Sequence, residues 1–187
     1  MAVRELLTDD GAEDLALELV CGEEGLDNLI VRPRIQKPGL ALAGFLEYIH
    51  PGRVQILGKS EIHFLQERAP EERARIASMV CRHGVCCFIL TESLGFLEEL
   101  KGAAEISDVP VFRTDLQSSV VIDALSAFLQ DRLAPRSVTH GVLMDVYGLG
   151  VSILGDSGIG KSECALDLVV RGHRLVSDDV VEMKRIG

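Results

Sequence analysis

The chain has 187 residues, of which 47% are hydrophobic and 4% aromatic, and its formal net charge at pH 7 is −10. This composition is typical of a globular protein with an aliphatic core, in one medium-sized domain or two small ones. The acidic balance argues against nucleic acid and anionic membranes as partners, because both are bound by clustered Lys and Arg.

No apolar run approaches the roughly 18–20 residues needed to span a bilayer, and residues 1–10 lack the apolar stretch of a signal peptide. The five cysteines do not follow a disulfide-framework spacing. These features predict a protein of the reducing cytoplasm.

Strand-like and helix-like patterns alternate along the first part of the chain. Residues 3–7 resemble a short helix, and residues 16–20 a short helix or a strand. Further on, the apolar patterns predict strands over 54–57, 85–91 and 109–113, and helices over 61–65, 70–81, 94–104 and 118–133. Ser118 or Ser119 is expected to cap the last helix. Such alternation predicts an α/β fold with a mainly parallel sheet.

The residue pattern changes after the segment Ala-Pro-Arg-Ser at residues 134–137, which interrupts the regular structure. Val142, Met144 and Val146 alternate with other residues as in a strand, and residues 151–154 predict a second strand. The two are expected to form a hairpin with a tight turn at residues 148–150. We therefore place a domain boundary near residue 133, between an N-terminal α/β domain (1–133) and the first part of a second domain (134–187).

Residues 155–162 match the phosphate-binding pattern G-x-x-x-x-G-K-[ST] at every specified position. Glycines allow backbone N–H groups to approach phosphate oxygens, the Lys ammonium can reach the β and γ phosphates, and the Ser hydroxyl can bind Mg²⁺. The helix expected over 163–171 adds its N-terminal dipole, and Gly172 is expected to end it. The predicted nucleotide-binding residues are Gly155, Asp156, Ser157, Gly158, Ile159, Gly160, Lys161 and Ser162, with Ser162 also the predicted metal ligand.

An acidic pair, Asp178 and Asp179, follows an apolar segment shortly after this loop. A carboxylate there can meet Mg²⁺ or accept the proton of an attacking hydroxyl. If the segment is extended, neighbouring side chains point to opposite sides, so one of the two should face the phosphates. His140 is expected to open the strand that leads into the hairpin, which could bring it near the same place. A lone His at the start of a strand is, however, more often structural or solvent-facing.

Several stretches of the chain resemble the bacterial HPr kinase/phosphorylase family. The most specific are residues 140–148, 155–162 and 171–179. Residues 34–44, 55–61 and 132–135 are similar to the first domain of that family. The likeness covers nearly the whole chain.

The resemblance implies an enzyme that uses ATP, and possibly pyrophosphate, to phosphorylate a serine of HPr, the small phosphocarrier of the sugar phosphotransferase system. It also implies the reverse reaction, in which inorganic phosphate attacks phosphoserine and releases pyrophosphate. Carried over residue by residue, His140 and Lys161 become active-site residues, Ser162 binds Mg²⁺, and Asp179 is the base for phosphorylation and the acid for the reversal. Asp178 is the alternative to Asp179.

Family members are typically hexameric and continue well beyond the position of Gly187. The resemblance therefore implies a chain truncated within its kinase domain, with little activity by itself. The alternative from another class is a non-catalytic nucleotide-binding or interaction protein. A P-loop kinase of a small metabolite is disfavoured by the block from 140 to 179.

Cys81, His83, Cys86 and Cys87 form a cluster that could suggest zinc. Cys86 and Cys87 begin an apolar strand and should face opposite ways, so buried free thiols are expected instead of a metal site. Cys164 is expected to be a small packing residue.

Overall fold

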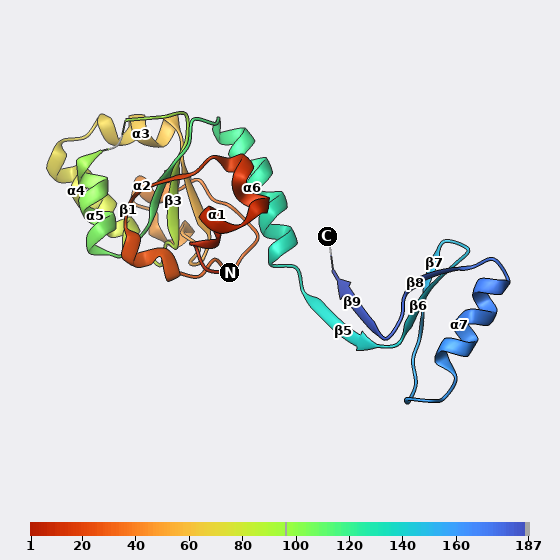
Figure 1. The fold of residues 1–187 in the computed structure, drawn as a ribbon. Coiled ribbons are helices and arrows are strands. Elements are labelled where there is room, and N and C mark those ends of the chain that lie inside the picture. Colours follow the sequence, from red (N-terminus) through yellow and green to blue (C-terminus); the bar gives the residue numbers. More distant parts are fainter. Residues whose placement is uncertain (96, 186–187) are drawn as a thin grey trace. The chain divides into compact units, whose positions relative to one another are not determined.

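The computed structural model describes residues 1–95 and 97–185, and it divides into two compact units, Met1–Leu133 and Ala134–Gly187 (Figure 1). The first unit is built around the strands β1 (Glu18–Cys21), β2 (Val54–Leu57), β3 (Cys87–Leu90) and β4 (Val111–Arg113) in the order β1-β4-β3-β2. β2, β3 and β4 run parallel and β1 is antiparallel to β4. The expected α/β fold with a mainly parallel sheet is confirmed.

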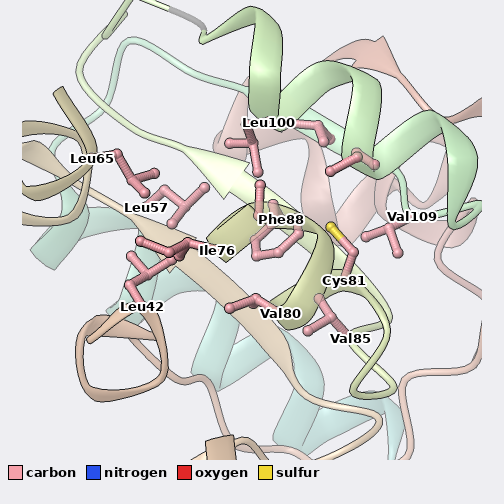
Figure 2. Packing of buried hydrophobic residues seen from close by; sticks show 14 of the residues in the cluster. Leu42, Leu57, Leu65, Ile76, Val80, Cys81, Val85, Phe88, Leu100 and Val109 are labelled. Carbon is pink, nitrogen blue, oxygen red and sulfur yellow. The ribbon is translucent and has the colours of Figure 1, made fainter. Parts of the chain in front are cut away.

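Helices cover both faces of this sheet. One face packs against α3 (Lys59–Gln66), α4 (Pro70–Cys81) and α5 (Glu98–Ile106), while the other packs against α1 (Glu5–Thr8), the 3₁₀ helix η1 (Asp10–Leu15) and α6 (Ser118–Arg132) (Figure 1). The unit is completed by the short α2 (Gly39–Leu42), η2 (Glu23–Asp27) and η3 (Leu46–Tyr48). Figure 2 shows how Phe88 lies among Val80, Cys81 and Leu100 in the first of these cores.

Successive side chains of a strand point to opposite faces of the sheet, and β3 therefore contributes side chains to both cores. Phe88 and Leu90 point into the first cluster, whereas Cys87 and Ile89 point into the second, and all of them are at most 1% exposed. β3 is thus apolar at every position because both of its faces are buried.

The predicted strand 54–57 and helix 70–81 are confirmed, and the ambiguous segment 16–20 contains the strand β1. The strand predicted over 85–91 is shorter, and the helix predicted over 94–104 begins at Glu98; Phe96 lies outside the described residues. The serine cap of α6 was wrong. Gln117 is the N-cap residue, and the Ser118 hydroxyl instead lies 2.7 Å from the Thr91 hydroxyl.

Over residues 134–185, the second unit contains antiparallel strand pairs and one helix. β6 (Val142–Val146) lies between β7 (Leu149–Ile153) and β8 (Arg174–Ser177), and β5 (Arg136–His140) pairs with β9 (Val180–Lys184). α7 (Lys161–Val170) packs on β6 through Ala165, against the buried Val142 and Met144. The segment before β6 and the segment after Asp179 therefore form a strand pair that the sequence did not predict.

The predicted hairpin is confirmed, but its turn lies one residue earlier than expected. Val146 pairs with Leu149, so the loop consists of Tyr147 and Gly148, with φ of 54° and 82°. Positive φ at both central residues is the mark of a type I′ turn, whose twist suits a hairpin. Glycine is the favoured second residue; a tyrosine in the first position is strained.

None of the helices in the described part of the chain is long and apolar enough to cross a bilayer.

Candidate active site

The phosphate-binding pattern forms the connection between β7 and α7. β7 ends at Ile153 and α7 begins at Lys161. Gly158 and Gly160 have φ of +80° and +100°, conformations that side chains with a Cβ rarely adopt. Gly160 is the N-cap residue of α7, so the unpaired N–H groups of the first helical turn and the positive end of the helix dipole are directed at the loop.

The Lys161 side chain folds back over this loop. Its ammonium donates hydrogen bonds to the carbonyl oxygens of Gly155 and Asp156, each 2.8 Å away. The two bonds connect the start of the helix to the start of the loop. They therefore fix the loop's width at the point where phosphate oxygens would enter.

The far end of α7 is closed by Gly172, whose φ is +95°. The N–H of Gly172 donates to the Val169 carbonyl at 2.9 Å, and that of His173 donates to the Leu168 carbonyl at 3.0 Å. This is the Schellman arrangement that ends many helices, and the expected end of the helix at Gly172 is confirmed.

A pocket of about 580 Å³ opens beside the loop. His140, Lys161, Ser162 and both aspartates of the acidic pair line it, together with Gly155, Ser157, Gly158 and Gly160 of the loop. Two of the predicted nucleotide-binding residues do not line it. Asp156 contributes its carbonyl to Lys161, and the Ile159 side chain is 69% exposed.

His140 reaches this pocket by a route other than the predicted one. It does not open the hairpin strand; it is the last residue of β5, where it pairs with Val180 of β9. The next residue, Gly141, donates its N–H to the Asp179 carbonyl at 3.2 Å. The β5–β9 pair thus holds His140 beside the acidic pair.

Asp178 and Asp179 occupy the turn between β8 and β9, so the expectation of an extended segment was wrong. Asp179 has a φ of 71°, which breaks the alternation of a strand and allows both residues to line the pocket. The Asp178 carboxylate accepts the Asp179 N–H at 3.0 Å. That bond orients the Asp178 carboxylate towards the backbone of the next residue.

Sequence reasoning missed the contributions of Gly141 and Glu163 to this pocket. Glu163 follows Ser162 in the first turn of α7, and its position there was the signal that could have identified it. The lining combines one lysine and one histidine with the carboxylates of Glu163, Asp178 and Asp179. Because carboxylates outnumber the basic side chains, the pocket favours a phosphate ligand that binds together with a cation.

The oxygen atoms in the pocket fit Mg²⁺. Ser162 offers a hydroxyl and the acidic pair offers carboxylates, which are the hard ligands that this ion prefers. Among residues 1–95 and 97–185, no three His, Cys, Asp or Glu side chains converge as a metal cage. Few protein ligands are expected where Mg²⁺ retains waters and binds phosphate oxygens.

One expectation about the cysteine cluster was wrong, because Cys86 precedes β3 and packs, like Cys87, in the second of the two cores, so the two side chains do not face opposite ways. Cys81, Cys86 and Cys87 are buried free thiols, and His83 lies with its Nδ1 2.7 Å from the Met79 carbonyl oxygen. Cys164 is exposed, so its interpretation as a packing residue was wrong. It lies on a face of α7 other than the one that carries Ala165.

The sequence comparisons identify one family. Residues 2–129 match the family described as "HPr Serine kinase N terminus", and residues 131–187 match "HPr Serine kinase C-terminal domain". The HPr kinase/phosphorylase of Geobacter sulfurreducens is 49% identical over 185 residues, which are 99% of this chain and 58% of that protein. The HPr kinase/phosphorylase of Bacillus subtilis is 43% identical over 178 residues, 95% of this chain and 57% of that protein.

Among solved structures, the CBS and DRTGG domains of the regulatory region of Clostridium perfringens pyrophosphatase align with 63% of this chain and 45% of that one. The sequence identity is 19% and the TM-score is 0.39, too low a similarity to bear on function. The chain spans about 58% of the length of the Geobacter relative. The two matched regions cover almost every residue, and the chain therefore belongs to the HPr kinase/phosphorylase family.

Proposed function

We propose that the protein to which this chain belongs transfers the γ-phosphoryl group of ATP to a serine of HPr, and that inorganic phosphate reverses the reaction. The observation that carries the proposal is the single pocket lined by His140, Lys161, Ser162 and the acidic pair. Membership of the HPr kinase/phosphorylase family supplies the phosphoacceptor.

Each side chain has a role that follows from its chemistry. The Lys161 ammonium compensates charge on the transferred phosphoryl group, and the N–H groups at the start of α7 bind phosphate oxygens. Ser162 would hold Mg²⁺, which supplies further compensation of phosphate charge when the nucleotide is bound. His140 lies beside the acidic pair and is proposed to orient the reacting groups.

A serine hydroxyl is a weak nucleophile, so a carboxylate that accepts its proton accelerates attack. We assign this role to Asp179, which in the reverse reaction returns the proton to the departing serine oxygen. The hydrogen bond between the Asp178 carboxylate and the Asp179 N–H supports the choice, because it directs Asp178 towards the backbone. In Asp179→Asn we expect transfer to fall by about 10²-fold or more, and in Asp178→Asn by less.

Further proposals concern the protein as a whole. It is cytoplasmic, as the free thiols suggest, and it assembles with copies of itself. The 1–133 region is proposed as a separate domain for assembly or regulation, and residues 134–187 as the first part of the kinase domain. Pyrophosphate is proposed as a second donor, since the loop would bind phosphate oxygens, which pyrophosphate and ATP share.

The test is transfer of labelled phosphate from ATP and Mg²⁺ to purified HPr, with the phosphorylated residue identified by mass spectrometry. The 187-residue chain, its Lys161→Ala variant and the Geobacter relative are assayed in parallel. Serine phosphorylation that the variant lacks supports the kinase function in this chain.

The rival function is nucleotide binding without transfer. It gains support if the chain binds ATP, Lys161→Ala weakens that binding, and HPr stays unmodified while the Geobacter relative is active. If neither the chain nor the relative modifies HPr, the proposed reaction is wrong.

A further inference from the structure

A second, smaller pocket lies in the first unit, between α2, α3 and α4. Its volume is about 110 Å³. Ala41, Leu42 and Ile76, each at most 7% exposed, provide apolar side chains in its wall. Part of the wall belongs to residues 34–44, a segment that resembles the family and that the proposed phosphotransfer does not use.

One side of this pocket carries a guanidinium whose position is fixed. The Arg68 guanidinium carbon lies 3.5 Å from the centre of the Phe64 ring, and its Nη1 donates to the Phe64 carbonyl at 2.8 Å. Stacking and this hydrogen bond hold the planar group in place, while its other N–H groups remain available. A fixed guanidinium loses little entropy when it binds an anion.

A second arginine faces the same space. Arg75 lines the pocket, and its Nη1 lies 3.3 Å from the Met79 sulfur. Within residues 1–95 and 97–185, no ion pair joins Arg68 or Arg75 to a carboxylate, although the whole chain has a net charge of −10. Glu72 is the one acidic residue of the lining, which leaves the pocket with a single excess positive charge.

We propose that this pocket binds a short-chain monocarboxylate. The apolar wall suits a hydrocarbon tail, and the two guanidinium groups suit a planar carboxylate that accepts paired hydrogen bonds. One excess positive charge matches one negative charge better than the two of a phosphate monoester. The volume admits a ligand of a few heavy atoms, for which a Kd on the order of 1 mM is expected.

The probe is sodium butyrate, added to the ¹⁵N-labelled 187-residue chain while amide shifts are recorded. Saturable shifts are expected at Ala41–Gly44 and around Phe64. Butyramide, which has nearly the same shape without the charge, and inorganic phosphate are titrated alongside. In Arg68→Gln and in Arg75→Gln the Kd should rise about tenfold, since each variant loses a charge-assisted hydrogen-bond donor.

Arg82→Gln is the matched control, because Arg82 is an exposed arginine at the end of α4 that does not line the pocket. Its Kd should equal that of the unmodified chain. Amide dispersion in each spectrum verifies that the variant is folded, and either pocket variant alone suffices for the test.

Several results would overturn the proposal. These are butyrate shifts that do not saturate, butyramide or phosphate binding as tightly as butyrate, or an equal loss in Arg82→Gln. None of them depends on HPr or ATP, so failure here is distinct from failure of the proposed phosphotransfer.

Discussion

Gly141 is predicted to be indispensable to the geometry of the candidate active site. It connects β5 to β6, and a Cβ built on it would lie 2.7 Å from the Ile153 carbonyl oxygen and 2.7 Å from Leu154 Cδ2. Leu154 is 60% exposed and can rotate away. The Ile153 carbonyl cannot move away in the same manner, because it is part of the backbone at the end of β7, just before the phosphate loop.

The displacement in Gly141→Ala can be bounded. Real Cβ atoms keep at least 3.0 Å from a neighbouring heavy atom and reach ordinary contact at 3.4 Å, so the end of β7 must move by about 0.3 to 0.7 Å. Overpacking of this kind costs about 1–3 kcal/mol in unfolding free energy. A shift of this size at Gly155 should also raise the Kd for ATP–Mg²⁺ roughly 4-fold to 25-fold, by analogy with the ~100-fold cost of a 1 Å misplacement.

Gly150→Ala is the matched control. It lies in β7 of the same hairpin, where an added Cβ would be 3.9 Å from Leu143 Cδ1, an ordinary contact. Alanine there should be neutral or should stabilise by about 0.5 kcal/mol, because it restricts the unfolded chain. The same substitution is therefore expected to have opposite effects at two glycines of one small unit.

Hydrogen exchange of the β6 amides measures the opening free energy of the unit, and isothermal titration measures the Kd for ATP–Mg²⁺. Equal opening free energies in the two variants would show that the close approach of Gly141 to Ile153 does not determine the stability of the second unit. Unchanged nucleotide affinity in a destabilised Gly141→Ala would refute the idea that the displacement reaches the phosphate loop.

Three other predictions are independent of that contact. Tyr147→Asn should stabilise the second unit by about 0.5–1 kcal/mol, because asparagine tolerates the φ of 54° in the hairpin turn better than tyrosine does; a lower opening free energy of the β6 amides would contradict this. Burial raises the pKa of the Cys81 thiol from 9.0 to about 12, so its contribution to stability is complete below pH 9 and is lost as pH rises towards 12. Cys81 should contribute up to about 1.4 kcal/mol per pH unit to the fall of the unfolding free energy in this window, in addition to the contributions of the buried Cys21 and Cys87, whose pKa values are also raised, and an equally steep fall in Cys81→Ala would be inconsistent with it. A thiol reagent added to the folded chain should modify Cys164 rapidly and the buried Cys21, Cys81, Cys86 and Cys87 slowly, all five reacting after denaturation; fast reaction of Cys87 would contradict the burial.

The sequence predicted those parts of the structure that local patterns determine. The helix 70–81 has Pro70 in its first turn and was placed correctly, as was the strand 54–57. The phosphate loop was recognisable because its chemistry requires specific residues at fixed spacings. Family resemblance, not periodicity, connected it with His140.

What could not be predicted depends on contacts between distant residues. The β5–β9 pair joins segments about forty residues apart, and neither strand has a strong pattern, so His140 was assigned to the wrong strand. The φ of Asp179 is fixed by the turn between β8 and β9, and no local sequence pattern predicted this turn. The serine cap failed for a similar reason, because Ser118 bonds to Thr91 in a loop far along the chain.

The two hydrogen bonds from Lys161 to its own loop have a kinetic consequence. With Gly155 and Asp156 already held at 2.8 Å by the ammonium, the loop is preorganised, and phosphate entry requires the rotation of one side chain and no refolding of the backbone. Side-chain rotations take picoseconds to nanoseconds, far faster than diffusional encounter at micromolar nucleotide. Association of the triphosphate should therefore show a rate linear in nucleotide concentration, with no plateau set by a conformational step.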